Sequence, residues 1–178
     1  VDIKKVVIIG SGTMGSGIAA QVANAGIPVT LLDLPSKEGS RNQITENAKE
    51  RILTFRPPLL VEKNKIDLIS AGNIEDDFNL VGNADWVVEA VVERIDIKHN
   101  IYDNIEKVRK EESIISSNTS TIPLKALSER MSDQMKKNFC ITHFFNPVRY
   151  MGLLEIVTEP INDKEKIDIL KSFCDEKL

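Results

Sequence analysis

The sequence has only two cysteines, Cys140 and Cys174, and their separation matches no metal-binding spacing. Cys140 lies in an apolar run typical of a strand, and Cys174 lies in a segment with helical periodicity. We therefore expect two reduced thiols, buried or half-buried, in an intracellular protein, and no metal site.

Long apolar runs and a strong charge of one sign are also missing. The longest apolar runs are as short as a strand, so we expect no transmembrane segment, and no signal peptide is visible. The formal net charge of −4 argues against nucleic acid or a membrane surface as a partner, although a local basic patch could still contact cofactor phosphates. Internal repeats and low-complexity segments are absent. These features favour a cytoplasmic location.

The composition that remains is that of an ordinary globular protein. The 178 residues are 42% hydrophobic and 28% charged, which is sufficient for one domain with a substantial core. We therefore predict one domain over residues 1–178.

The most informative stretch is a G-x-G-x-x-G motif that follows an apolar, β-branched run and opens a helical pattern over 13–25. Gly10 permits the tight turn, Gly12 lets a pyrophosphate approach the backbone, and Gly15 lets the helix pack closely on the strand. In the first helical turn, Thr13 and Met14 lie where free N–H groups and the helix dipole attract phosphate, although a methionine by itself belongs more often to a core.

An acidic residue completes this pattern. Residues 27–32 read as a second strand, and Asp33 stands at its end. Its carboxylate can bind the adenosine ribose hydroxyls and would repel the 2′-phosphate of NADP. The alternative is a glycine-rich turn with a helix-capping aspartate, but strand, glycines, helix, strand and acid occur in the expected order. The stretch therefore predicts a βαβ unit that binds NAD.

The insertion from Asp33 to Asp85 is longer than a plain βαβ connection. Apolar spacing predicts a helix over 40–55, ended by two prolines, and a second short helix over 59–69, broken by Gly72-Asn73. The segment is rich in Lys, Arg, Asn and Glu. It could be a solvated helical pair or could hold an anionic substrate.

The remaining pattern alternates strands with helices. We expect strands over 84–92, 113–117, 139–142 and 153–157, and helices over 94–108, 124–131 and 161–178. The fold class predicted is α/β, a Rossmann-like, doubly wound, mostly parallel sheet with an inserted helical pair.

Polar residues gather near the ends of these strands, where open α/β sheets bind ligands. They are Asn118, Ser120, His143, Asn146 and Glu155. An isolated histidine is more often a capping or core residue, but here several polar residues fall near the ends of strands in one predicted sheet. A carboxylate inside the apolar run of Glu155 favours a partnered side chain.

Four motifs give the chain a specific resemblance: G-S-G-T-M-G (10–15), W-V-V-E-A-V-V-E (86–93), S-N-T-S-T (117–121) and H-F-F-N-P-V-R-Y-M-G-L-L-E (143–155). They resemble the amino-terminal, NAD-binding domain of L-3-hydroxyacyl-CoA dehydrogenases, in that family's order and over nearly the whole chain. The S-N-T-S-T-I-P-L run (117–124) and the variant Arg149-Tyr150-Met151 resemble the longer members, which carry an enoyl-CoA hydratase module. The resemblance implies NAD-dependent oxidation of 3-hydroxyacyl-CoA to 3-ketoacyl-CoA, as in fatty-acid β-oxidation.

The resemblance also implies roles for single residues. His143 matches the catalytic histidine, Glu155 the carboxylate that orients it, and Ser120 the serine that holds the substrate oxygen. Histidine suits the removal of a hydroxyl proton because its ordinary pKa lies near neutrality, and a carboxylate can fix its tautomer.

Other matched positions concern the cofactor. On the nicotinamide-ribose side of the cofactor, the matching residues are Glu93, Lys98 and Asn146, with Asn118 and Ser120 beside them. On the adenosine and pyrophosphate side, they are Asp33 and the three glycines. A first-turn glutamate and a nearby lysine are also ordinary in helices. The sequence of the insertion differs from the shorter members, so no residue is assigned to CoA.

The family's helical second domain, which supplies dimer contacts and the acyl pocket, has no counterpart in these residues. We therefore expect a fragment that binds cofactor without turning over substrate, from a homo-oligomer assembled through that domain. Two alternatives stay open: a non-catalytic NAD-binding or structural protein on the same fold, and a dehydrogenase for another hydroxy acid.

Overall fold

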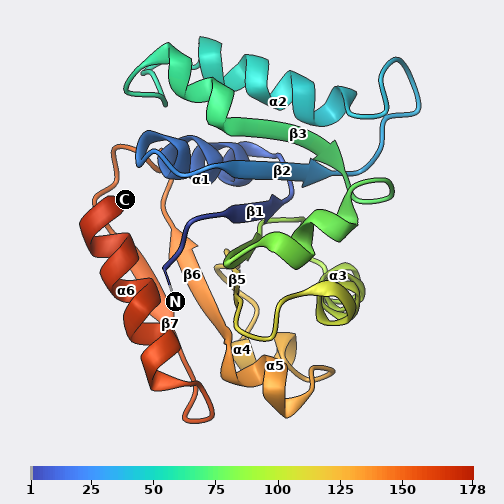
Figure 1. Ribbon diagram of the computed structural model, residues 1–178, viewed down its shortest axis with the longest axis vertical. Coiled ribbons are helices and arrows are strands. Elements are labelled where there is room, and N and C mark those ends of the chain that lie inside the picture. Colours follow the sequence, from blue (N-terminus) through green and yellow to red (C-terminus); the bar gives the residue numbers. More distant parts are fainter. Residues whose placement is uncertain (1) are drawn as a thin grey trace.

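The computed structural model describes residues 2–178, which are built around a seven-stranded sheet of order β3-β2-β1-β4-β5-β6-β7 (Figure 1). Strands β1 to β6 run parallel, and β7 is antiparallel to β6. The predicted Rossmann-like, doubly wound fold is therefore confirmed. The strands are β1 (Val6–Ile9), β2 (Val29–Asp33), β3 (Ile69–Asn73), β4 (Trp86–Glu89), β5 (Ile114–Ser117), β6 (Phe139–Phe144) and β7 (Leu154–Val157).

Helices cover both faces of the sheet (Figure 1). Core residues of α1, α2 and α6 pack on one face, and those of α3, α4 and α5 on the other. The α-helices are α1 (Thr13–Asn24), α2 (Gln43–Thr54), α3 (Ile95–Val108), α4 (Leu124–Leu127), α5 (Asp133–Lys137) and α6 (Lys164–Lys177), and the 3₁₀ helices are η1 (Lys63–Leu68) and η2 (Phe78–Asn83).

The apolar strands are continuous because both of their faces are buried. Along β1, Val6 and Ile8 belong to the core under α1, whereas Val7 and Ile9 belong to the core under α3. All four are at most 1% exposed. Successive side chains of a strand point to opposite faces, so each face receives every second residue. Each such burial contributes about 1.5–3 kcal/mol relative to an exposed side chain.

The structure corrects the prediction for the insertion. Instead of a helix over 59–69 followed by a break, it has the short 3₁₀ helix η1 and then β3, which pairs in parallel with β2. Gly72 lies inside this strand, where an added Cβ would come within 2.8 Å of Leu32. This glycine serves close packing at the edge of the sheet rather than a chain break. The pairing with β2 outweighs the weak local pattern.

Three other boundaries differ from the predictions. The strand predicted over 84–92 ends at Glu89, where the ladder to β5 stops. The strand predicted over 139–142 continues to Phe144, because β7 pairs with it as far as that residue, so His143 lies inside β6. The predicted helix over 124–131 is shorter, and α5 follows it, capped by the Ser132 hydroxyl.

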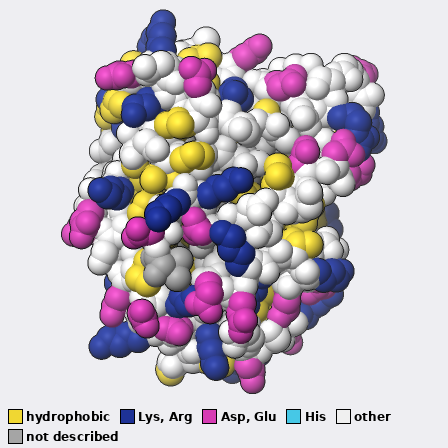
Figure 2. Space-filling model, viewed as in Figure 1, with side chains coloured by type: hydrophobic (Ala, Val, Ile, Leu, Met, Phe, Trp, Pro, Cys, Tyr) yellow, Lys and Arg dark blue, Asp and Glu magenta, His cyan; other side chains and the backbone are white. Residues whose placement is uncertain are grey.

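Both cysteines are free thiols, Cys140 buried in β6 and Cys174 half-buried in α6, as predicted. Burial raises the pKa of each to about 12, so both are poor nucleophiles. Within residues 2–178, no helix combines the length and apolarity needed to cross a membrane. On the face seen in Figure 2, acidic and basic side chains are interspersed, and neither sign forms a continuous field.

Candidate cofactor and active site

The glycine-rich turn joins β1 to α1 at the carboxyl edge of the sheet. Gly10 has a φ of +105°, and an added Cβ would lie 2.4 Å from the Ala90 carbonyl oxygen. A Cβ on Gly15 would lie 1.8 Å from the Gly10 carbonyl oxygen, so helix and turn approach as closely as glycine permits. Nothing lies within 4 Å of a Cβ built on Gly12, which leaves the start of α1 open.

The open end of α1 has the properties of an anion site. Gly12 is its N-cap, no side chain caps it, and its first turn contains no acidic residue. Gly12 and Thr13 are exposed, so the free N–H groups and the positive end of the helix dipole at the start of α1 are accessible to an anion. The geometry fits a pyrophosphate, and a Cβ on Gly12 would occupy the space that such a group needs.

Asp33 ends β2 beside this turn. Its Oδ2 accepts hydrogen bonds from the backbone N–H and the hydroxyl of Ser11, both at 2.6 Å. Its Oδ1 accepts from the N–H of Leu34 at 2.7 Å. The carboxylate is thereby fixed at the rim of the turn, half-buried, where a ribose bound next to the pyrophosphate would lie.

A cleft of about 360 Å³ lies next to the turn, and six of the predicted residues line it. They come from α1, the loop after β4, the loop after β5, and β6 with its following loop. These residues are Met14, Glu93, Asn118, Ser120, His143 and Asn146. Met14 thus faces the cleft, although methionine is more common in cores.

Two residues of the antiparallel strand pair meet at the edge of this cleft. His143 and Glu155 are directly paired in the β6–β7 register, and His143 Nδ1 lies 2.8 Å from Glu155 Oε2. The contact predicted from the sequence is therefore present. The histidine side chain is 21% exposed and the glutamate 55%. With Nδ1 committed to the carboxylate, Nε2 is the ring nitrogen left to act as a proton acceptor.

Asn118 connects the neighbouring strands. Its side-chain oxygen accepts a hydrogen bond from the Phe144 N–H at 2.9 Å, and its own N–H donates to the Glu89 carbonyl. Asn118 therefore holds the ends of β4, β5 and β6 together, and the exposed Ser120 follows two residues later.

Lys98, which was predicted to line the cofactor site, does not line the cleft. Its side chain is 1% exposed, and its Nζ lies 2.7 Å from Glu89 and 3.2 Å from Glu93. Lys98 therefore lies beneath the wall of the cleft, and Glu93, 44% exposed, is the residue of this group that reaches the surface.

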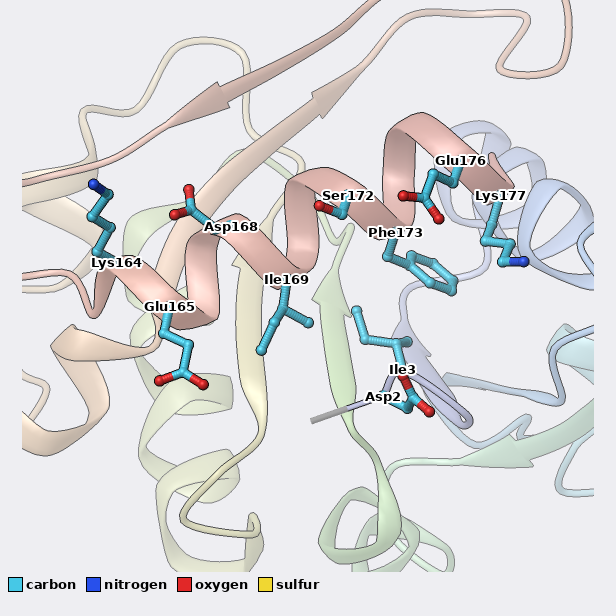
Figure 3. A pocket seen from close by; sticks show the side chains of 10 residues that line it. All are labelled: Asp2, Ile3, Lys164, Glu165, Asp168, Ile169, Ser172, Phe173, Glu176 and Lys177. Atoms are coloured by element: carbon cyan, nitrogen blue, oxygen red, sulfur yellow. The ribbon is translucent and has the colours of Figure 1, made fainter.

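A larger groove of about 700 Å³ lies elsewhere, between α6 and the segment before β1 (Figure 3). Ile169 and Phe173 point from α6 to the side on which Ile3 lies, and charged residues of α6 also line the groove. None of the predicted site residues lines it. Its size therefore does not make it the site of the chemistry.

Comparison with known families covers nearly the whole chain. Residues 5–177 match the profile of the family described as 3-hydroxyacyl-CoA dehydrogenase, NAD binding domain. The chain belongs to this family. Its cofactor is accordingly NAD, and this NAD-binding domain has the open helix terminus and acidic residue that such a cofactor requires.

Two curated relatives are similar over nearly the whole domain. A putative fatty acid oxidation complex trifunctional enzyme of Rickettsia felis is 46% identical over 99% of this chain and 25% of its own length. A probable 3-hydroxyacyl-CoA dehydrogenase of Deinococcus radiodurans is 43% identical over 99% of this chain and 51% of its own length. The domain thus spans about a quarter to a half of these relatives.

A solved structure has the same fold. The 3-hydroxyacyl-CoA dehydrogenase of Archaeoglobus fulgidus superposes on the domain with a TM-score of 0.78 and 27% identity. The match covers 97% of this chain and 53% of that one.

Two residues near the site were not identified from the sequence. Arg51 of α2 donates from Nη2 to the Ser11 carbonyl oxygen at 2.9 Å and so brings a positive charge to the glycine-rich turn. Glu89 is completely buried beneath Glu93. The sequence gives no signal for Arg51, because a basic residue in a polar helix is ordinary. It does give one for Glu89, since a carboxylate in an apolar strand implies a partner. The same signal singled out Glu155.

Proposed function

We propose that this domain is the cofactor-binding part of an enzyme that oxidises 3-hydroxyacyl-CoA to 3-ketoacyl-CoA. His143 acts as the general base, Glu155 orients it, and Ser120 binds the substrate hydroxyl. The observation that carries the proposal is the 2.8 Å contact between His143 Nδ1 and Glu155, on the cleft that Ser120 also lines.

The chemistry follows from this arrangement. Bound NAD⁺ supplies the acceptor for the hydride that leaves C3 of the substrate. The hydroxyl proton has to leave at the same stage, because otherwise the product would be a protonated carbonyl. Nε2 of His143 accepts it, and Glu155 stabilises the imidazolium that forms. Ser120 holds the substrate oxygen in line with the base.

The cofactor is held along the edge of the sheet. We assign the pyrophosphate to Gly10, Gly12, Gly15 and the first turn of α1, and the adenosine ribose to Asp33. Glu93, Asn118 and Asn146 line the cleft, and we assign the nicotinamide and its ribose to them. The names of the relatives, which include fatty acid oxidation enzymes, support a CoA thioester as the substrate.

The test is the substitution His143→Gln in the full-length enzyme. We expect kcat to fall about 10²–10⁴-fold with NAD affinity retained, because only the base is removed. Glu155→Gln should show a smaller loss, since the histidine remains but is no longer held by a charge. Glu129→Gln, at an exposed position after α4 and outside the cleft, serves as the surface control.

The substrate class is tested separately. The enzyme is assayed with a 3-hydroxyacyl-CoA, the corresponding free 3-hydroxy acid and a 2-hydroxy acid. Oxidation of the free acids at the same kcat/KM would contradict the CoA assignment. Full activity of the His143 variant would contradict the assignment of the base, whatever the substrate.

A further inference from the structure

The most completely hydrogen-bonded carboxylate near the site is Glu89, the last residue of the central strand β4 and 0% exposed. Its Oε1 accepts from Lys98 Nζ at 2.7 Å and from the Val91 N–H at 2.8 Å. Its Oε2 accepts from the Tyr102 hydroxyl at 2.5 Å and from the Ser117 hydroxyl at 2.6 Å. Four donors from β5, α3 and the loop after β4 therefore converge on one buried group.

Lys98 connects this carboxylate to the cleft. A buried ammonium is costly without an anionic partner, and Lys98 has two, with Glu89 below and Glu93 above. Its side chain is 1% exposed, so its charge cannot be screened by water. The position of the ammonium is therefore set by Glu89, and Lys98 in turn holds Glu93.

Glu93 is the member of this group that reaches the cleft. Its Oε1 contacts Lys98, and its Oε2 accepts from the hydroxyls of Thr119 at 2.6 Å and Thr121 at 3.1 Å. Burial alone would raise the pKa of Glu93, but these hydroxyls and the charge of Lys98 lower it overall. A carboxylate held by both oxygens in this way offers a fixed negative charge to a ligand.

The formal charges of the three residues do not cancel. Glu89 and Glu93 carry two negative charges and Lys98 one positive charge, which leaves a net charge of −1 at the wall of the cleft. The oxidised nicotinamide ring is positively charged and the reduced ring is neutral. This wall therefore favours the oxidised cofactor over the reduced one.

We propose that Glu89 is a positioning residue of the cofactor site: it neutralises Lys98 from below, so that Lys98 holds Glu93 where the nicotinamide nucleotide binds. The inference rests on the proposed function in one respect, the contact between Glu93 and the cofactor. A purely structural role of Glu89 differs from this positioning role. It requires only that the buried charge of Lys98 is not left unpaired.

Calorimetric titration of the 178-residue chain with NAD⁺ and with NADH, together with thermal unfolding, separates these roles. Glu89→Gln leaves the Lys98 charge without its buried partner. We expect this variant to have a lower Tm and a Kd for NAD⁺ that is raised about tenfold or more. The Kd for NADH should rise less, because the net charge of the wall becomes zero. Tyr102→Phe removes another partner of Glu89 but keeps the ion pair, and its two affinities should stay within about twofold of the wild type.

The double variant Glu89→Gln/Lys98→Met decides between the two roles. It removes both buried charges, so stability should recover. Under our proposal NAD⁺ affinity stays low, because nothing holds Glu93 from below. Recovery of affinity together with stability would overturn the positioning role of Glu89.

Glu93→Gln tests the assumption beneath the proposal. If this variant binds NAD⁺ as tightly as the wild type, then the contact of Glu93 with the cofactor is wrong and the proposed function loses that assignment. If it binds weakly while the double variant binds normally, then the cofactor contact stands and the inference about Glu89 alone is wrong.

Discussion

At the scale of single residues, the side chains at the carboxyl edge of the sheet are held by partners before any ligand arrives. Asp33 is bound by Ser11, and His143 by Glu155. Such contacts reduce the rotamer freedom that binding would otherwise have to remove. Each of these side chains therefore presents its polar atoms to a ligand from a fixed position.

Asp33 should decide between the two nicotinamide dinucleotides. We expect the domain to prefer NAD over NADP by at least about tenfold, because a 2′-phosphate next to a fixed carboxylate is repelled by roughly 1–4 kcal/mol at 4 Å. Asp33→Asn keeps the size of the side chain and should reduce the preference mainly by improving NADP binding. Calorimetric titration with both nucleotides measures this, and equal affinities of the wild type would refute it.

Arg51 provides the opposite charge at the same turn. Since its guanidinium contacts the Ser11 carbonyl beside the open start of α1, we expect it to attract the cofactor phosphates. Arg51→Gln should weaken NAD binding several-fold at low ionic strength and less at about 1 M salt, where the Debye length falls to about 3 Å. Arg56→Gln, two residues after the end of α2, is the control, because the Arg56 side chain bonds to the Thr54 and Phe55 carbonyls rather than to the glycine-rich turn. An unchanged Kd for the Arg51 variant at both salt concentrations would exclude the contact.

At the scale of elements, the turn between β1 and α1 combines two glycines with different functions. Gly15 permits the helix to touch the turn, whereas Gly12 leaves space outside it. Packing and binding can therefore be separated by one methyl group placed at either position.

Gly15→Ala should destabilise the domain by about 1–3 kcal/mol or more, because the new methyl group cannot fit 1.8 Å from the Gly10 carbonyl oxygen. Gly12→Ala should leave the Tm nearly unchanged, since Gly12 has an ordinary φ of −67° and open space around it. We expect Gly12→Ala to lose NAD affinity instead. Thermal unfolding and NAD titration of both variants check this, and a large loss of Tm in Gly12→Ala would contradict it.

At the scale of the whole molecule, the cofactor side and the substrate side differ in how fully these residues enclose them. On the cofactor side, the glycine-rich turn leads into the start of α1, and Asp33 is hydrogen-bonded to Ser11 of that turn. On the substrate side, Ser120 is exposed and Glu155 is 55% exposed. The curated relatives are also two to four times longer, since the domain spans 51% and 25% of their lengths.

We therefore expect the 178-residue chain to bind NAD but not to oxidise 3-hydroxyacyl-CoA at an appreciable rate. A misplacement of the reacting atoms by about 1 Å can cost about a hundredfold in rate, and among residues 2–178 the side chains of Ser120 and Glu155 remain open to solvent on the substrate side. An assay with NAD and 3-hydroxyacyl-CoA, beside the full-length enzyme, measures this. Turnover by the domain at an ordinary rate of about 10 s⁻¹ would show that it is catalytically complete.

Local patterns in the sequence determined much of this protein. The apolar runs, the spacing of Gly10, Gly12 and Gly15, and the position of Asp33 were enough to predict the doubly wound fold and NAD as the cofactor. These features depend on residues close together in the chain, so their physical reasons act locally. The contact between His143 and Glu155 was implied by the resemblance to the family, and it was plausible because both residues lie on successive strands.

Other features were decided only by the tertiary structure. Strand β3 forms because β2 offers a free edge for pairing. The weak local pattern around Gly72 does not predict this strand. Lys98 matched a cofactor position, but α3 packs against the sheet so that its charge ends beneath Glu93, next to Glu89. Whether a charged side chain lies in the cleft or under its wall depends on how a helix docks on a sheet. That docking is set by the packing of many distant residues together, which local spacing cannot specify.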